Sequence, residues 1–162
     1  MACRETRMEK VTIEDVDSRM SAANVRRGLS DDLGTNDMAI NYYELAPGDS
    51  FAFGYHAHVG QEEVFYIQSG SVTFETETGD VVVGAGEIVR FAPGEFQRGV
   101  NEGDERVIAL ALGAPRDSEL DEMRRNCDEC GERTANTLEM ADGGEELVTY
   151  CLDCGAETGR FD

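Results

Sequence analysis

The 162-residue sequence predicts an all-β sandwich or barrel followed by a small, separate C-terminal module. From Met38 onward, short segments of alternating apolar and polar residues recur about every 8 to 12 residues. Turns rich in glycine separate these segments, and no apolar stripe with helical spacing interrupts them. After Gly113 the alternation stops, so we expect the barrel to end there and a different structure to follow.

Each expected element follows from this pattern. Residues 1–19 form an N-terminal extension and residues 20–114 form the barrel. Early in the chain the patterning is mixed, with 24–28 and 31–36 typical of loops, and we expect one or two poorly defined strands. Residues 115–125 are charged and carry little apolar surface, which predicts an acidic linker or a short exposed helix. The clearest strands are Met38–Leu45, Phe51–His58, Glu63–Gln68, Val72–Glu77, Asp80–Val83, Glu87–Phe91 and Arg106–Ala111.

The chain is strongly acidic, and its charge excludes two classes of partner. It has 34 Asp and Glu against 14 Lys and Arg, a formal net charge of −20. Repulsion from phosphate groups argues against nucleic acid and against anionic membrane surfaces as partners. The hydrophobic content of 40%, arranged in patterned runs, indicates a folded protein rather than a disordered one.

The composition resembles that of halophilic archaeal proteins, in which concentrated salt screens the repulsion between carboxylates. Lys10 is the only lysine, and the acidic residues are spread along the whole chain. An ordinary acidic protein is the alternative. The halophilic interpretation predicts that removal of salt unfolds the protein.

The sequence predicts a cytoplasmic protein without a membrane segment. Residues 1–17 are charged and lack the apolar core of a signal peptide. The longest uncharged apolar run, Val107–Ala114, is far shorter than the roughly 20 residues that cross a bilayer. In a reducing compartment the five cysteines are expected to be metal ligands rather than disulfides.

Four of these cysteines have the spacing of a zinc ribbon. They form two Cys-x-x-Cys pairs, Cys127 with Cys130 and Cys151 with Cys154. Two such turns place four thiolates around one Zn²⁺ ion. We expect residues 126–162 to form a zinc ribbon with strands over Thr134–Met140 and Glu146–Tyr150, in which zinc supplies the folding energy. The ribbon is a folding staple or a protein contact, and Cys3 is a free thiol.

The only two histidines of the chain lie two residues apart, at His56 and His58. On a strand, side chains at i and i+2 share a face, so both imidazoles point the same way. Glu63 opens the next strand and would bring a carboxylate beside them. Two histidines and one carboxylate are the ligands of a facial-triad metal site. The alternative is an incidental pair in an architectural barrel.

These residues resemble the two sequence motifs of the cupin family. The first motif is matched by Gly48, His56, His58, Glu63 and Gly70. The second is matched by Gly86, Gly94 and Asn101, but Gln97 stands where the family has a histidine ligand. The resemblance covers roughly residues 43–114. It implies a double-sheet jelly-roll barrel that binds a divalent transition metal, such as iron, manganese, zinc or nickel.

The resemblance implies that His56, His58 and Glu63 are metal ligands. Gln97 either ligates through its weaker amide oxygen, or hydrogen-bonds a metal-bound water, or marks a degenerate site. Cupins of this kind are commonly homodimers that pair through their sheets, which implies a homodimer here.

Two functions fit these residues. The first is a metal-dependent oxygenase or isomerase that acts on a small molecule. The second is a non-enzymatic module that senses or binds a small-molecule ligand and docks to a protein through the ribbon. Phe96 is expected at the cavity mouth, and Arg90 and Arg98 either bind an anionic substrate or lie at the surface.

Overall fold

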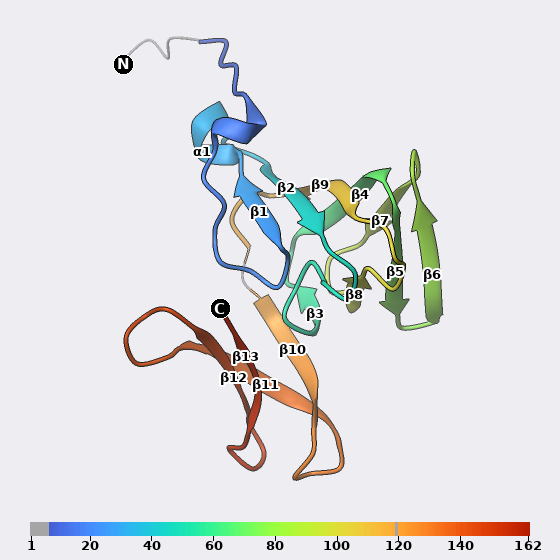
Figure 1. Ribbon diagram of the computed structural model, residues 1–162, viewed down its shortest axis with the longest axis vertical. Helices are drawn as coiled ribbons and strands as arrows, with labels where there is room; N and C mark the ends of the chain where they lie inside the picture. The colour runs from blue at the N-terminus through green and yellow to red at the C-terminus, as the bar shows by residue number, and fades with distance from the viewer. Residues whose placement is uncertain (1–6, 119) are drawn as a thin grey trace.

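The computed structural model describes residues 7–118 and 120–162, so Cys3 and the free thiol expected there lie outside the described residues. It confirms the all-β fold: the described residues form thirteen strands in two antiparallel sheets, with a 3-10 turn η1 (Ile13–Asp15) and a one-turn helix α1 (Ser30–Leu33) near the N-terminus (Figure 1). No helix in the described ranges has the length and apolar character needed to span a membrane.

The smaller sheet has five strands. In spatial order they are β1 (Val25–Gly28), β2 (Ala39–Leu45), β9 (Val107–Ala114), β4 (Glu62–Ser69) and β7 (Ile88–Phe91). In β9 every second residue is buried, which is the period expected for a strand with one face on the core. Hydrogen bonding to β2 on one side and β4 on the other places β9 at the centre of this sheet.

The larger sheet has eight strands and continues beyond the barrel. In spatial order they are β13 (Glu157–Phe161), β12 (Leu147–Cys151), β11 (Glu132–Met140), β10 (Leu120–Cys127), β3 (Tyr55–His58), β8 (Gln97–Val100), β5 (Ser71–Thr76) and β6 (Gly79–Gly84). The first three of these strands form the C-terminal module, and the last four belong to the barrel. Strand β10 connects the two parts (Figure 1).

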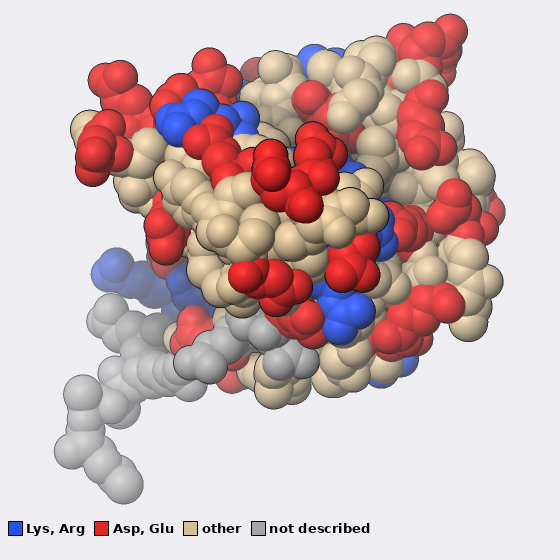
Figure 2. Space-filling view, turned by 90° about the horizontal axis from the view of Figure 1, so that it is seen from below, with Lys and Arg blue, Asp and Glu red and all other residues tan. Residues whose placement is uncertain are grey.

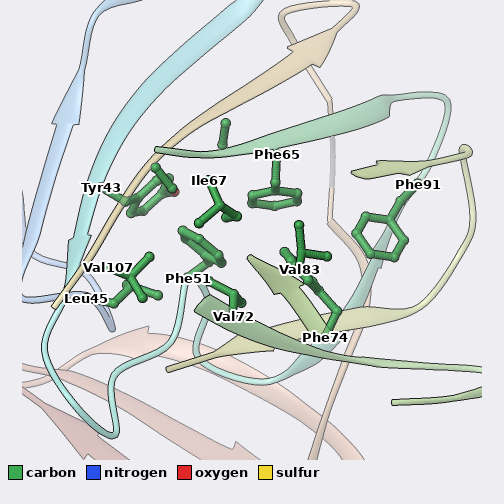
Figure 3. Packing of buried hydrophobic residues seen from close by; sticks show 12 residues of the cluster. Tyr43, Leu45, Phe51, Phe65, Ile67, Val72, Phe74, Val83, Phe91 and Val107 are labelled. Atoms are coloured by element: carbon green, nitrogen blue, oxygen red, sulfur yellow. The ribbon is translucent and has the colours of Figure 1, made fainter. Parts of the chain in front are cut away.

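The core fills the space between the two sheets of the barrel and is rich in phenylalanine (Figure 3). The Phe51 ring lies 4.8 Å from that of Phe65, and the Phe74 ring lies 5.3 Å from that of Phe91. Burying each such side chain contributes roughly 1.5–3 kcal/mol. Gly99 permits this packing, because a Cβ there would lie 2.6 Å from Phe51 and 2.7 Å from Phe74.

Two motif residues of the sequence have structural roles in turns. Gly70 has a φ of +77°, and a Cβ there would lie 2.9 Å from the backbone oxygen of Arg106, so only glycine fits. Asn101 is buried and its Nδ2 donates to the backbone oxygens of Leu45 at 3.0 Å and Glu105 at 2.7 Å. These bonds satisfy a buried amide and fix the loop that precedes β9.

The segment 115–125 differs from the linker or exposed helix that its charge predicts. Most of its second half belongs to β10, which pairs with β3 on one edge and with β11 on the other. Two of its three arginines pack on aromatic rings instead of lying free in solvent: Arg124 lies 4.7 Å from the Phe96 ring centroid and Arg125 lies 5.1 Å from that of Phe161. The barrel and the C-terminal module are therefore joined by a continuous sheet.

Candidate metal centres

Strand alternation and strand pairing bring the predicted barrel residues together. His56 and His58 share a face of β3, and His56 is paired with Gln97 of β8. Glu63 faces them from β4 in the opposite sheet. On β4 the expected alternation holds, because Phe65 and Ile67 are buried, whereas Tyr66 is 36% exposed. Glu62 points away from the cluster and its carboxylate binds Arg90 at 2.7 Å.

The donor atoms of His56, His58 and Glu63 all lie within 4.8 Å of one another. The Nδ1 atom of His56 is 3.0 Å from the backbone oxygen of Gly54. Because a carbonyl oxygen only accepts hydrogen bonds, Nδ1 carries the proton and Nε2 presents a lone pair to the cluster. His58 Nε2 lies 3.7 Å from Glu63 Oε2. Two imidazoles and one carboxylate thus converge on one point.

Burial shifts the protonation of all three groups. It lowers the pKa of His56 to about 4, against the hydrogen bond to Gly54, which raises it. It also lowers the pKa of His58. For Glu63 burial raises the pKa to about 7, against a smaller opposite effect of the hydrogen bond from Gln97. Near neutral pH both imidazoles are therefore uncharged, and the cluster lacks a positive charge to balance an ionised Glu63.

Gln97 supports the interpretation of this cluster as a metal site. Its Nε2 donates to Glu63 Oε2 at 3.0 Å and lies 3.4 Å from His56 Nε2. The amide nitrogen therefore points at the same two ligand atoms that would bind a metal ion. Its Oε1 is buried and has no hydrogen-bond partner among the described residues. If the amide oxygen and nitrogen exchanged places, Oε1 would face the ion and gain a bonding partner. The residues therefore fit a divalent cation with N and O ligands.

The cluster lies in a cavity of about 290 Å³, and sequence analysis missed two of the polar residues that line it. Arg26 of β1 and Tyr43 of β2 both line this cavity, and the Nε of Arg26 is buried without a partner in the described part of the chain. Burial raises the pKa of Tyr43 and keeps its hydroxyl protonated. Arg26 was missed because residues 24–28 have the composition of a loop, which gives no signal for an inward-facing side chain.

Phe96, which was expected at the cavity mouth, does not line the cavity, and neither do Arg90 and Arg98, for which the cavity was one of two alternatives. The Phe96 ring stacks on that of Tyr55 at 5.2 Å. Arg90 lies on the outer face with Glu62, and Arg98 lines a different pocket. The positions of Arg90 and Arg98 follow from the alternation of β7 and β8, which turns residues next to a buried neighbour outward.

The four cysteines of the C-terminal module also converge. Their Sγ atoms lie within 4.8 Å of one another, with Cys127 3.5 Å from Cys154 and Cys130 3.9 Å from Cys151. Four sulfurs bound to zinc at about 2.3 Å in a tetrahedron would be about 3.8 Å apart. The Thr134 hydroxyl, 3.1 Å from Cys151 Sγ, lowers the pKa of that thiol to about 6, which favours the thiolate that a metal requires.

Comparisons with known proteins agree with the barrel. Residues 41–113 match the family model described as a cupin domain. A search of curated protein sequences gave no significant match. Among solved structures, the chain is similar to a sugar phosphate isomerase of the cupin superfamily from Silicibacter pomeroyi, with 18% identity, a TM-score of 0.59, and coverage of 92% of this chain and 91% of the other.

Two further solved structures resemble mainly the barrel. The polyketide cyclase RemF from Streptomyces resistomycificus has 25% identity and a TM-score of 0.56, with coverage of 69% of this chain and 82% of the cyclase. A predicted oxalate decarboxylase from Thermotoga maritima has 23% identity and a TM-score of 0.57, with coverage of 65% and 98%. The barrel of this chain therefore has the cupin fold, and residues 41–113 match the model of the cupin domain.

Proposed function

We propose that the barrel is a metal-dependent enzyme of isomerase type that acts on a small anionic molecule. His56, His58 and Glu63 hold a divalent transition metal, with Gln97 as a weak fourth ligand. The observation that carries this proposal is the convergence of two uncharged imidazoles and one carboxylate in a cavity of about 290 Å³. That volume is close to the lower end of the range for small-molecule sites.

The residues around the ligands support an anionic substrate. Arg26 forms no ion pair with any residue that the structure describes, and it lines the same cavity as the three ligands. A carboxylate or phosphate of the substrate would neutralise this guanidinium. The protonated Tyr43 hydroxyl then stands ready to donate a hydrogen bond to a substrate oxygen. A bound metal ion would add Lewis acidity at a second substrate oxygen.

The relatives in the fold comparison include a sugar phosphate isomerase and a polyketide cyclase, whose names describe rearrangements of small molecules. We propose that this chain also rearranges a small molecule. The zinc site of the C-terminal module and a homodimeric assembly belong to the same proposal.

Metal analysis of the full-length protein in concentrated salt tests the site. We expect about two metal equivalents in the wild-type protein, of which His56→Ala removes one and Cys154→Ser removes the other. If His56→Ala loses no metal while Cys154→Ser does, the barrel site is refuted and the C-terminal site is retained.

Activity is tested separately from metal content. Manganese-loaded protein is incubated without oxygen with a panel of small sugar phosphates and hydroxy-keto acids, and the products are followed by NMR. We expect conversion that His56→Ala abolishes. Oxygen uptake by iron-loaded protein would instead indicate an oxygenase, and the absence of both activities across the panel would contradict the proposed reaction class.

A non-enzymatic binding module is the second candidate, and one observation favours it. Met123 of β10 and Leu138 of β11 line the barrel cavity together with the histidines. A ligand in the cavity would therefore touch the C-terminal module, which could pass a binding event to a protein partner. Ligand binding that changes hydrogen exchange in β11–β13 without any turnover would support this second function.

A further inference from the structure

We propose that a small dianion, such as phosphate or sulfate, binds in a second pocket at the junction of the barrel and the C-terminal module. This pocket has a volume of about 250 Å³. Four arginines line it: Arg98 of β8, Arg124 and Arg125 of β10, and Arg133 of β11. The site is distinct from the barrel cavity and does not depend on the reaction proposed above.

The concentration of positive charge here is unusual for this molecule. The chain has 14 basic residues against 34 acidic ones, and carboxylates dominate the face shown in Figure 2. Four of the 14 basic side chains nevertheless line one pocket, and Asp128 is the one acidic residue among the described lining residues. Like charges brought together in this way repel one another unless an anion lies between them.

Two of the four guanidinium groups lack a carboxylate partner. The side chain of Arg98 is partly buried and forms no hydrogen bond or ion pair with any described residue, and its Nε is fully buried. Arg125 donates only to the uncharged backbone oxygens of Phe53 and Thr158, and its Nε is likewise buried without a partner. Burial lowers the pKa of both groups, and the charge of Arg98 lowers that of Arg125 further.

Two carboxylates near the pocket already pair with arginines, whereas Asp128, which lines it, forms no ion pair with a described residue. Glu122 binds Arg124 through both of its oxygens, at 3.0 and 2.9 Å, and Glu75 binds Arg133 in the same two-point manner. No described carboxylate forms an ion pair with Arg98 or Arg125, although the nearby charge of Glu75 raises the pKa of Arg98 against the effect of burial. Two guanidinium groups without an ion-pair partner match the charge of one dianion, which is why phosphate or sulfate fits better than chloride.

The remaining contacts hold the arginines in place. Arg124 stacks over Phe96, Arg125 over Phe161, and Arg133 lies 4.9 Å from the centroid of the Tyr55 ring. A structural role in docking the C-terminal module explains these three side chains without an anion. It does not explain Arg98, whose guanidinium has no ring contact or hydrogen bond in the described part of the chain. An anion bound by Arg98 and Arg125 would connect β8 to β10.

Calorimetric titration of the metal-loaded, full-length protein with inorganic phosphate tests the proposal, with sulfate and chloride as parallel arms at constant ionic strength. We expect saturable binding of phosphate and sulfate at one site and none of chloride. Arg98→Gln should weaken binding about tenfold or more, since it removes a charge-assisted hydrogen bond. Arg90→Gln, which removes an exposed arginine elsewhere, should leave binding unchanged.

Two further measurements distinguish this site from the barrel cavity and distinguish anion binding from a purely structural role of Arg98. Arg26→Gln should leave phosphate binding intact, and loss of binding in that variant would assign the anion to the barrel cavity instead. Without a dianion, Arg98→Gln should unfold at the same temperature as wild-type protein or a higher one, and with phosphate the order should reverse. A lower unfolding temperature for Arg98→Gln in both conditions would overturn the proposal in favour of a purely structural arginine.

Discussion

At the scale of the single residue, we expect Gln97 to set how tightly the proposed barrel site holds a metal ion. Its side chain already lies within 3.0 Å of Glu63 and 3.4 Å of His56, so a histidine there would reach the same point. An imidazole is a stronger ligand for a transition metal than an amide oxygen. We therefore expect Gln97→His to raise the affinity of the barrel for Ni²⁺ or Zn²⁺ by about tenfold or more, as expected for the addition of a strong ligand.

The measurement is a competition titration against a chromophoric chelator, with the C-terminal site kept saturated with zinc. Gln68→His is the matched control, because Gln68 lies on β4 but is exposed and faces away from the cluster. Equal affinities in wild-type protein and Gln97→His would show that residue 97 does not face the ion.

Glu63 makes the stability of the metal-free protein depend on pH. Because burial raises the pKa of Glu63 to about 7 in the folded state, from its ordinary value of 4.5, the unfolded chain loses this proton first. Stability is therefore lost as the pH rises from about 4.5 through 7. Glu63→Gln removes this loss, so it should stabilise the metal-free protein by ~2–3 kcal/mol at pH 8 and change little at pH 4.5.

Urea denaturation of both proteins with a chelator of the barrel metal measures this difference. His56 and His58 are present in both proteins, so their titration cancels. Glu62→Gln is the control, because Glu62 is a partly exposed residue paired with Arg90 and should change stability by less than ~1 kcal/mol at either pH. A destabilising effect of Glu63→Gln at pH 8 would refute the assignment of a buried, costly carboxylate.

Some of the site could be predicted from the sequence because its geometry is local. The i, i+2 spacing of His56 and His58 fixes their common face, and the alternation of β4 fixes the direction of Glu63. Arg26 and Arg98 could not be placed in this way. Each contributes to its pocket through contacts between strands that are distant in the sequence, and hydropathy carries no signal for an inward-facing arginine.

At the scale of the element, strands were predictable where apolar residues alternate and unpredictable where other residues occupy the buried positions. Strands β2, β4 and β9 follow the predicted segments closely. Strand β8 was missed because its buried positions are Gln97 and Gly99, neither of which raises hydropathy. Strand β10 was missed because strand pairing on both edges, rather than apolar burial, keeps its charged sequence extended.

The sharing of β10 couples the C-terminal module to the barrel. Met123 is paired with His56, while Cys127 at the end of the same strand belongs to the cysteine cluster. Zinc binding contributes on the order of 10 kcal/mol or more to modules of this size. We expect Cys154→Ser to remove hydrogen-exchange protection from β11–β13 completely and from β3 and β10 in part.

Hydrogen exchange followed by mass spectrometry measures this effect, and a zinc chelator should reproduce it in wild-type protein. Cys3→Ser is the control, because Cys3 lies outside the two Cys-x-x-Cys pairs. Protection of β11–β13 that survives the loss of metal would show that packing alone folds the module.

At the scale of the whole molecule, the net charge of −20 opposes the compact state. The acidic side chains are spread over the face shown in Figure 2 rather than gathered in one patch, so their repulsion acts on the entire fold. The Debye length falls from about 10 Å at 0.1 M salt to about 3 Å at 1 M, which screens most pairs of surface carboxylates. We therefore expect the urea midpoint at pH 8 to fall steadily as potassium chloride is lowered from 3 M to 0.1 M.

A second pH distinguishes charge screening from a general effect of salt on apolar surface. The sequence has a pI of about 4.3, so at pH 5 much of the net charge is neutralised and the salt dependence should be clearly smaller than at pH 8. Equal salt dependence at both pH values would assign the effect to salting-out of the core. A midpoint independent of salt at pH 8 would show that self-repulsion does not limit the stability of this acidic fold.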